Sequence, residues 1–327
     1  MKTSILATGL SCIALAAHAE TPVLTVYAGE YFTSEWGPGP AIETGFEAIC
    51  GCDLQFSTGD LLPRLLLEGA RTQADVVIGL STDVLARARA AGLFAPHGQD
   101  LAALTVPVEW PDDTFLPFNW GHTAFVYDTT RMAEPPASLE AMRRLPDGVT
   151  VVIQDPRTSI SGLALVLWVK AVYGDQAGAF WADLAPHILT VTKGWSESYG
   201  LFTSGEADMV LSYTTSPAYH RHVDKTERYR AAAFSEGHYA QIEVAAKVAH
   251  SPNQALADQF LAFMLSPEFQ NIIPTTNWMY PATRSHTALP AAFNGLVSPK
   301  TTLLFDASVV ARQRKIWIRE WLDALTD

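Results

Sequence analysis

The chain has 327 residues, with 34 acidic and 22 basic side chains, and its formal net charge is −12. This length exceeds what a single compact core usually holds, which favours two α/β lobes. A hydrophobic content of 48% argues against disorder, and the acidic balance argues against a nucleic-acid or anionic-membrane partner. Three cysteines are too few for a disulfide-built fold or a paired CxxC zinc module.

The first residues have the pattern of a secretory signal peptide. Lys2 precedes a short apolar run that ends in Ala17-His18-Ala19, a small-x-small cleavage site. The run is too short to span a bilayer. We therefore expect residues 1–19 to be removed and the mature chain to be exported. A buried N-terminal helix and a lipid anchor at Cys12 are the weaker alternatives.

Cys50 and Cys52 flank a single glycine. Export places them in an oxidising compartment, where a disulfide can persist. Gly51 removes the Cβ that would obstruct so tight a bridge. No His or second Cys cluster lies nearby, so a small disulfide is favoured over a metal-binding pair.

Short apolar runs alternate with helical patterns along the first third of the chain. Ile42, Phe46 and Ile49 share one face of a helix, and Ser81 or Thr82 is expected to cap a later one. The expected order is strand 23–27, the helix through 42–49, strand 53–56, a helix through 61–66, strand 74–80 and a helix that ends at Gly92. This alternation favours a mostly parallel sheet.

A second alternating set follows, without a Gly/Ser-rich tether between the two. We therefore expect the chain to cross between lobes along its strands and to bend at a few residues. The expected elements are strands 124–127, 149–153, 188–192, 208–213 and 242–248, and helices 162–173, 197–203, around 260–264, and 308–324.

Several loops that follow expected strands carry hydroxyls and aromatic rings. Ligands of open α/β sheets bind at the carboxyl ends of strands, and a helix N-terminus offers free N–H groups to an anion. Ser159 lies in such a strand-to-helix loop, with ordinary N-capping as the alternative. Trp195 follows another strand, and Tyr213, Tyr219 and Trp278 lie in or near comparable loops. Because ring faces attract cations, the set fits a small cationic aromatic ligand, although each ring alone could be core packing.

Other candidate groups fit catalysis or metal binding less well. The loop at 193–200 resembles a nucleophile elbow, but Ser198 replaces its last glycine and no Asp–His sequel follows. His220 and His222 are expected to be a solvated pair, since no ligand set completes a metal site. Asp60 and Glu243 are lone carboxylates, of which Asp60 could reach the cleft.

Longer motifs extend over nearly the whole mature chain. They are PVLTVY at 22–27, WGPGP at 36–40, Cys50-x-Cys52, ADVV at 74–77, QDPRTS at 154–159, TVTKGWSE at 190–197, LSYTTSPAY at 211–219, FSEGHY at 234–239 and NWMYP at 277–281. In these motifs the chain resembles the bacterial periplasmic thiamine-binding proteins, the substrate-binding components of thiamine ABC importers. The resemblance implies an α/β, two-lobed periplasmic binding protein of type II-like architecture, with mixed, mostly parallel sheets and hinge crossovers.

The same resemblance implies the ligand and the residues that hold it. The lobes would close around thiamine or its mono- and diphosphate and deliver it to a membrane permease. Four aromatic residues would surround the thiazolium and pyrimidine rings: Trp195, Tyr213, Tyr219 and Trp278. Ser159 and Ile160 would face the hydroxyethyl or phosphate end. Further lining residues would be Thr58, Gly59, Asp60, Thr214, Thr215, Ser216 and Pro217. Gly29 stands where relatives can carry an aromatic, so one wall of the pyrimidine slot is expected to be missing.

The implied division of the chain follows the lobes. Residues 1–19 are the signal peptide, 20–118 the first part of lobe 1, 119–236 lobe 2, 237–285 the second part of lobe 1, and 286–327 a C-terminal helical segment on lobe 2. We expect a periplasmic monomer with no catalytic residue, metal or cofactor.

Two alternatives stay open. A thiamine-cleaving enzyme of similar fold needs a free cysteine nucleophile beside a base, and the two mature cysteines are expected to be paired. A ferric-iron binder of similar architecture needs adjacent tyrosines, and the chain has no Tyr-Tyr pair.

Replacing Trp195 by Ala is expected to weaken thiamine binding by about 1–3 kcal/mol, because ring burial and cation–π attraction are both lost. Isothermal titration calorimetry measures the change. An unaltered affinity would remove this residue from the site.

Overall fold

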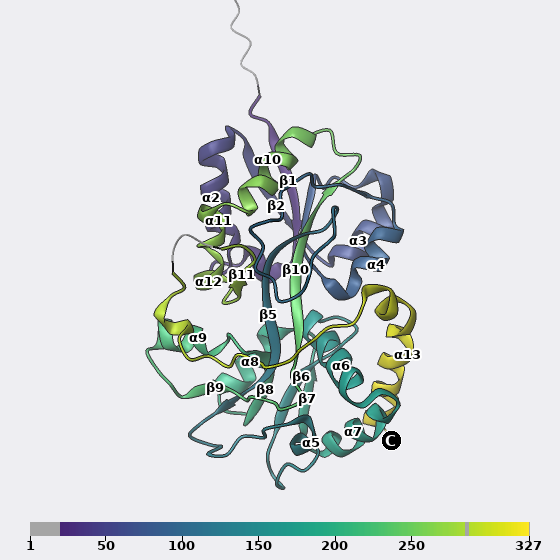
Figure 1. The fold of residues 1–327 in the computed structure, drawn as a ribbon, viewed down its shortest axis with the longest axis vertical. Helices are drawn as coiled ribbons and strands as arrows, with labels where there is room; N and C mark the ends of the chain where they lie inside the picture. The colour runs from purple at the N-terminus through teal and green to yellow at the C-terminus, as the bar shows by residue number, and fades with distance from the viewer. Residues whose placement is uncertain (1–19, 285–287, 327) are drawn as a thin grey trace, which may run out of the picture.

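The structure is a computed structural model that describes residues 20–284 and 288–326. The predicted signal peptide, residues 1–19, lies outside this range. Two α/β lobes lie one above the other and are joined by long strands (Figure 1). Across the described residues, no helix combines the length and the apolar character that crossing a membrane requires.

Lobe 1 contains three parallel strands with helices between them. β1 (Val23–Ala28) pairs in parallel with both β2 (Asp53–Thr58) and β3 (Val76–Ser81). The helices of this part are α1 (Glu30–Thr33), α2 (Gly39–Cys50), α3 (Leu61–Glu68) and α4 (Leu85–Ala90). Ile42 and Phe46 of α2 are fully buried, whereas Ile49 is 57% exposed, so the apolar face is narrower than predicted.

The predicted cap of the helix after β3 is wrong. The chain first makes the short 3-10 turn η2 (Thr82–Val84), and α4 begins only at Leu85. The hydroxyls of Ser81 and Thr82 are buried and have no hydrogen-bond partner among the described residues. Local spacing suggested a cap. In the structure, η2 packs against α13 (Ala307–Thr326), and its Asp83 accepts a hydrogen bond from Tyr239.

Lobe 2 repeats the parallel arrangement. β6 (Val151–Gln154) pairs in parallel with β7 (Ile188–Thr192) and β8 (Met209–Tyr213). Its helices are α5 (Leu139–Met142), α6 (Ile160–Tyr173), α7 (Ala177–Leu184), α8 (Trp195–Thr203) and α9 (Pro217–Tyr219), followed by the π-turn η5 (His220–Asp224). Residues 161–170 of α6 are all buried, as expected for a helix that is apolar on every side.

Two long strands carry the chain between the lobes. β5 (Leu116–Asp128) pairs through its first half with β10 (His238–Val248) and through its second half with β8. The path through the sheet is β2-β1-β3-β10-β5-β8-β6-β7, and every pairing of β5 on this path is antiparallel. The predicted crossing along strands is confirmed, and the antiparallel crossing strands make the sheet mixed.

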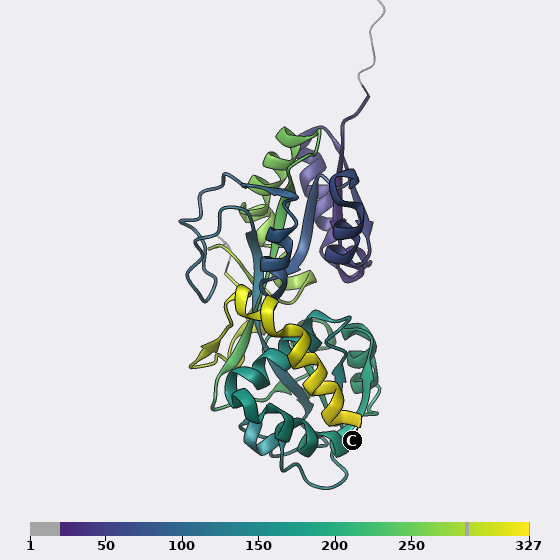
Figure 2. The same ribbon diagram turned by 90° about the vertical axis from the view of Figure 1, so that its right-hand side faces the viewer.

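The remaining elements complete the lobes. They are β4 (Phe94–Ala95), β9 (Tyr229–Ala231), α10 (Gln254–Met264), α11 (Pro267–Gln270), α12 (Ile273–Thr276), β11 (Tyr280–Pro281), β12 (Thr302–Leu303) and α13 (Ala307–Thr326). Val310 and Trp321 of α13 are buried in the core of lobe 2. The first turns of α13 also lie against η2 and α4 of lobe 1, so this helix runs alongside the junction (Figure 2).

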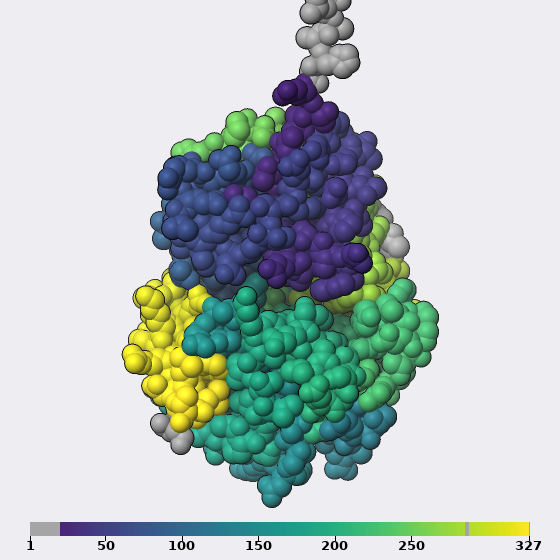
Figure 3. All heavy atoms as spheres, turned by 180° about the vertical axis from the view of Figure 1, so that it is seen from behind, coloured from purple at the N-terminus to yellow at the C-terminus, as the bar shows by residue number. Residues whose placement is uncertain are grey.

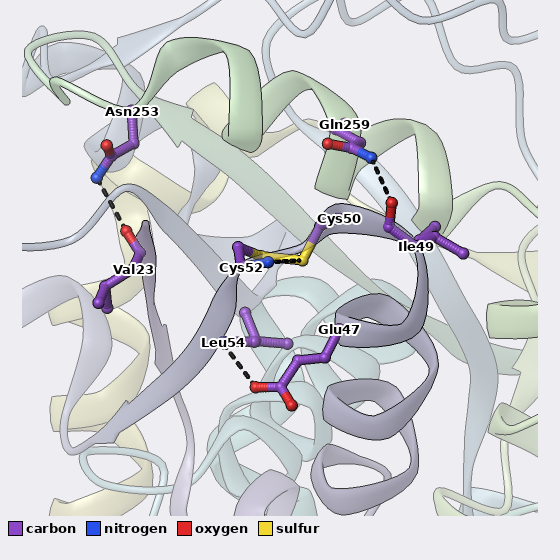
Figure 4. Close-up of a disulfide and its surroundings, with 8 residues drawn as sticks. All are labelled: Val23, Glu47, Ile49, Cys50, Cys52, Leu54, Asn253 and Gln259. Atoms are coloured by element: carbon purple, nitrogen blue, oxygen red, sulfur yellow. Dashed lines mark hydrogen bonds between the residues drawn. A yellow bond between two sulfur atoms is a disulfide. The ribbon is translucent and has the colours of Figure 1, made fainter. Parts of the chain in front are cut away.

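The predicted disulfide between Cys50 and Cys52 is present, with an S–S distance of 2.07 Å. It lies where α2 ends and β2 begins, at the edge of lobe 1 (Figure 4). Beside it, the carboxylate of Glu47 accepts a hydrogen bond from the backbone N–H of Leu54 at 2.9 Å. The bridge therefore belongs to the edge of the lobe.

An ion pair between the buried carboxylate of Asp128 and the more exposed Arg228 lies at the far end of β5. Asp128 is 1% exposed and accepts hydrogen bonds from Arg228 and from both the N–H and the hydroxyl of Thr130. Burial alone would raise the pKa of Asp128, but the hydrogen bonds from Arg228 and Thr130 lower it to about 2.

Asp128→Asn is expected to lower the free energy of unfolding at pH 7 by about 2 kcal/mol, since the depressed pKa reports that much stabilisation of the ionised form. This contribution is present above the ordinary pKa near 3.8 and is lost as the pH falls through about 2. The difference from wild type, measured by urea unfolding, should therefore shrink below pH 4. Asp147→Asn, at an exposed position of the same lobe, is the matched control, and an equal effect of both variants would contradict the assignment.

Candidate functional site

The carboxyl ends of both sets of parallel strands meet between the lobes. Tyr31 follows β1 of lobe 1 and Tyr213 ends β8 of lobe 2. Both reach the crossing strand β10, where Tyr31 bonds Glu243 and Tyr213 bonds Gln241. A furrow separates the lobes on the face opposite to Figure 1 (Figure 3). We refer to the residues at these strand ends and on the adjoining stretch of β10 as the interlobe site.

Aromatic rings from both lobes lie at this site. Trp195 begins α8, is half-buried, and donates its indole N–H to the hydroxyl of Ser212 at 2.8 Å. Tyr219 of lobe 2 lies edge-to-face with Trp278 of lobe 1, with ring centroids 5.3 Å apart. Trp278 has a positive φ of 54°, which is costly for a bulky residue and characteristic of functional positions.

The turn after β8 supports these rings from within. Ser212 and Ser216 share a hydrogen bond of 2.7 Å, and Ser216 also accepts from the backbone N–H of Tyr213. Thr214 and Thr215 are fully buried, and the hydroxyl of Thr215 faces the sulfur of Met279 at 3.7 Å. The predicted lining residues Thr214, Thr215, Ser216 and Pro217 are thus all buried. They shape the wall and expose little hydroxyl surface.

The N-terminus of α6 has the predicted place at the end of β6. Ser159 caps the helix by accepting from the N–H of Gly162 at 3.3 Å, and its hydroxyl also lies 3.1 Å from that of Ser161. A Cβ at Gly162 would collide with the carbonyl of Gln154, so glycine lets α6 begin close against the strand. Capping, the alternative considered from sequence, is therefore confirmed. Ile160 is the first residue of the helix.

The loop after β2 lies at the carboxyl end of that strand. Thr58 and Asp60 are exposed, and Gly59 between them has a φ of +151°. Asp60 precedes α3, but among the described residues its carboxylate makes no cap, hydrogen bond or ion pair. This carboxylate is consequently available to a ligand.

A buried carboxylate at the hinge was missed from sequence. Glu243 was interpreted as a lone carboxylate, but it is 4% exposed and has three hydrogen-bond donors. Tyr31 donates at 2.5 Å, Asn119 at 2.6 Å and Asn277 at 3.5 Å. Burial raises the pKa of Glu243 above its usual value, and these hydrogen bonds oppose only part of that rise. A buried carboxylate of this kind favours a positive charge beside it.

Tyr31 lies over Gly29, the position at which one wall of the pyrimidine slot is expected to be missing. A Cβ added to Gly29 would lie 2.8 Å from the ring of Tyr31, so the phenol ring itself covers this glycine. Burial and the neighbouring Glu243 raise the pKa of Tyr31, which keeps its hydroxyl protonated as a donor. An aromatic ring two positions along the chain therefore covers Gly29. The only sequence signal was Tyr31 itself, in the loop after a strand.

The structure also shows the environment of Ser198 and of the two histidines considered from sequence. Ser198 is fully buried and bonded to Gln154 and the carbonyl of Trp195, so it is no exposed nucleophile. His220 is 2% exposed and not the solvated residue predicted, whereas His222 faces the ring of Trp278 at 5.8 Å. In residues 20–284 and 288–326, no group of three His, Cys, Asp or Glu side chains could hold a metal ion.

Comparison with known proteins agrees with this geometry. Residues 40–271 match the model of the family described as bacterial extracellular solute-binding protein. The chain belongs to this family. The thiamine-binding periplasmic protein of Escherichia coli (strain K12) is 51% identical over 309 residues, which cover 93% of this chain and 94% of that protein. The protein of the same name from Brucella abortus is 50% identical over 305 residues, covering 92% and 91%.

A solved structure is similar over the same extent. A periplasmic thiamin binding protein has a TM-score of 0.90 and 51% identity, covering 93% of this chain and 96% of that one. The chain therefore belongs with the thiamine-binding periplasmic proteins, and the predicted periplasmic-binding-protein fold is confirmed. Members of this group are binding proteins and not enzymes.

Glu243→Gln is expected to leave the ligand-free protein equally stable or more stable at pH 8. The amide removes a buried charge, and Asn119, whose Oδ1 has no partner, can rotate its side-chain amide to accept from the new N–H group. Because the native pKa of Glu243 is raised, wild type gains stability relative to the variant as the pH falls toward 4.5. Urea unfolding at pH 8 and pH 5 measures both effects, and a variant less stable by several kcal/mol at pH 8 would contradict them.

Proposed function

We propose that this solute-binding protein captures thiamine in the interlobe site. The observation that carries the proposal is the buried carboxylate of Glu243 within a site lined by aromatic rings. Thiamine combines a permanently positive thiazolium with a flat aminopyrimidine, so it offers one charge to the carboxylate and two ring faces to the walls. Cation–π contacts contribute about 0.5–2 kcal/mol each, more when water is excluded. Relatives about 50% identical and named for thiamine support the same ligand.

The arrangement of the site suggests an orientation for the ligand. Trp195, Tyr213, Tyr219 and Trp278 would face the rings. The α6 N-terminus at Ser159 and Ile160 would face the hydroxyethyl group or the phosphates of thiamine mono- and diphosphate, because free N–H groups and the helix dipole favour an anion there. Asp60, exposed and without a bonded partner, could accept from the ligand amine, with Thr58 and Gly59 shaping the loop around it.

The family membership places the protein in the periplasm, and its export would proceed by cleavage after Ala19. Lobe closure about β5 and β10 would sequester the ligand and present it, as a monomer, to the permease of an ABC importer. Trp195 and Trp278 lie on different lobes, so only a closed state brings both against one ligand. A ligand shifts the lobes toward closure by its greater affinity for that state. No further cofactor takes part in this proposal.

Titration of tryptophan fluorescence with thiamine, its monophosphate and its diphosphate tests the function. We expect saturable binding of thiamine by wild type and binding about 5- to 50-fold weaker by Glu243→Gln, because the carboxylate no longer offsets the thiazolium charge. Asp147→Asn, at an exposed position before the amino end of β6, should bind as wild type does. The order of the three ligands ranks the phosphorylated forms.

Absence of saturable binding of all three compounds would reject the proposal. Equal affinity of wild type and Glu243→Gln would remove the carboxylate from it and leave the ring walls as the only recognition element. Thiamine recovered intact after incubation also separates binding from cleavage.

A further inference from the structure

His220 lies behind the aromatic walls of the interlobe site, in a place that no sequence pattern indicated. It is the first residue of η5 and is 2% exposed. Its ring packs against three tyrosines: Tyr199 at 5.8 Å, Tyr219 at 5.1 Å and Tyr229 at 4.2 Å between centroids. The orientation of an imidazole enclosed in this way is set by the hydrogen-bond partners of its two ring nitrogens.

Both nitrogens of His220 are hydrogen-bonded. Nδ1 lies 2.7 Å from the carboxylate of Asp224, and Nε2 lies 2.9 Å from the hydroxyl of Tyr199. A carboxylate can only accept, so Asp224 requires a proton on Nδ1. Nε2 of the neutral ring is then an acceptor, and the Tyr199 hydroxyl donates to it. Burial raises the pKa of Tyr199, which keeps this donor protonated.

His220 and its partner Tyr199 contact the aromatic residues of both lobes through their rings. The ring of Tyr199 is stacked on Trp195, with centroids 4.6 Å apart and planes 22° apart. On its other side, His220 meets Tyr219, which is edge-to-face with Trp278. The one imidazole thus lies directly behind a ring of each aromatic pair.

We propose that His220 is a positioning residue of the interlobe site, which holds Tyr199 flat behind Trp195 and, through its neutral state, keeps positive charge away from the back of the ligand walls. This inference rests on the proposed function, because the ligand that it concerns is the cationic thiamine.

Protonation of His220 would change both features. Nε2 would become a donor, so the Tyr199 hydroxyl would have to turn from donor to acceptor. A positive charge would also appear behind rings that face a cation. Burial lowers the pKa of His220 below 6.5, and Asp224 opposes part of that shift. The imidazole is therefore neutral at pH 7.5, and it becomes charged only at a pH lower than an unperturbed imidazole needs.

The groups that face His220 limit what else can titrate there. They are Tyr199 from α8, Tyr219 from α9, Tyr229 from β9, Asp224 from η5, and Arg228, whose charge further lowers the pKa of the imidazole. Burial raises the pKa of Tyr199, and the hydrogen bond to Asp128 raises the pKa of Arg228, so Tyr199 stays neutral and Arg228 stays charged between pH 5 and 8. The pKa of Glu243 in the site is also raised, so its titration affects every protein that contains it. The effect of His220 is therefore the difference in affinity between wild type and His220→Gln, which both keep Glu243.

Nitrogen-15 NMR of the ligand-free protein at pH 7.5 tests the geometry directly. Long-range proton–nitrogen correlations distinguish a protonated from an unprotonated ring nitrogen, and the signals absent from His220→Gln assign the residue. We expect Nδ1 to be protonated and Nε2 to be bare. The opposite tautomer, or a charged ring at this pH, would overturn the inference whether or not thiamine binds.

The pH profile of thiamine affinity tests the functional part. Gln at position 220 can still accept from Tyr199 but cannot become charged, so His220→Gln should bind within about threefold of wild type at pH 7.5. As acidification from pH 7.5 charges the imidazole, wild type should lose about fivefold more affinity than this variant, from the added charge alone. Asp224→Asn removes the opposing carboxylate and should shift the wild-type loss to lower pH.

Two controls separate positioning from a merely structural role. His250→Gln, at an exposed position, should show the wild-type profile throughout. Tyr199→Phe keeps the ring and removes the donor but leaves His220 able to become charged, so it should keep a loss of affinity on acidification that His220→Gln lacks. Parallel pH profiles of wild type and His220→Gln would overturn the inference. Failure of wild type to bind thiamine would instead reject the proposed function, and the tautomer would still decide the geometry.

Discussion

The buried carboxylate of Glu243 is the interaction on which the interlobe site depends. Burying an ionised group costs several kcal/mol unless hydrogen bonds and an opposite charge offset the lost hydration. Here Tyr31, Asn119 and Asn277 supply donors, but the structure contains no cationic side chain bonded to this carboxylate among the described residues. In the proposed function, a cationic ligand supplies the positive charge that this carboxylate lacks.

The sheet explains why this carboxylate can serve both lobes. Glu243 lies on β10, which pairs with β3 of lobe 1 and with β5, and its donors come from three separate segments. Tyr31 follows β1, Asn119 is on β5, and Asn277 immediately precedes the strained Trp278. Glu243 therefore links the loops that carry Tyr31 and Trp278 to the two crossing strands. If the lobes close on a ligand as proposed, these residues couple closure to binding.

The sequence predicted the regular elements well where the apolar pattern was long. The strand at 188–192 and the run of strand ends near Ser159, Trp195 and Tyr213 were placed correctly. Predictions failed for residues whose role depends on distant partners. Tyr31 and Glu243 are 212 positions apart in the sequence, and Tyr199 and His220 lie on different elements, α8 and η5. No local spacing relates the members of either pair. The cap at Ser81 failed for a similar reason, because packing between lobes shapes η2.

The sequence by itself predicted the two-lobed α/β class and the set of aromatic residues that follow strands, and it favoured the small disulfide that the structure contains, because each of these depends on local pattern or on motifs contiguous in the chain. Only the tertiary structure decided which polar groups are buried together: Glu243 with Tyr31 at the hinge, and His220 behind Trp195 and Tyr219. The physical reason is that desolvation and hydrogen bonding act through space, and the folded sheet alone brings these segments within reach of one another.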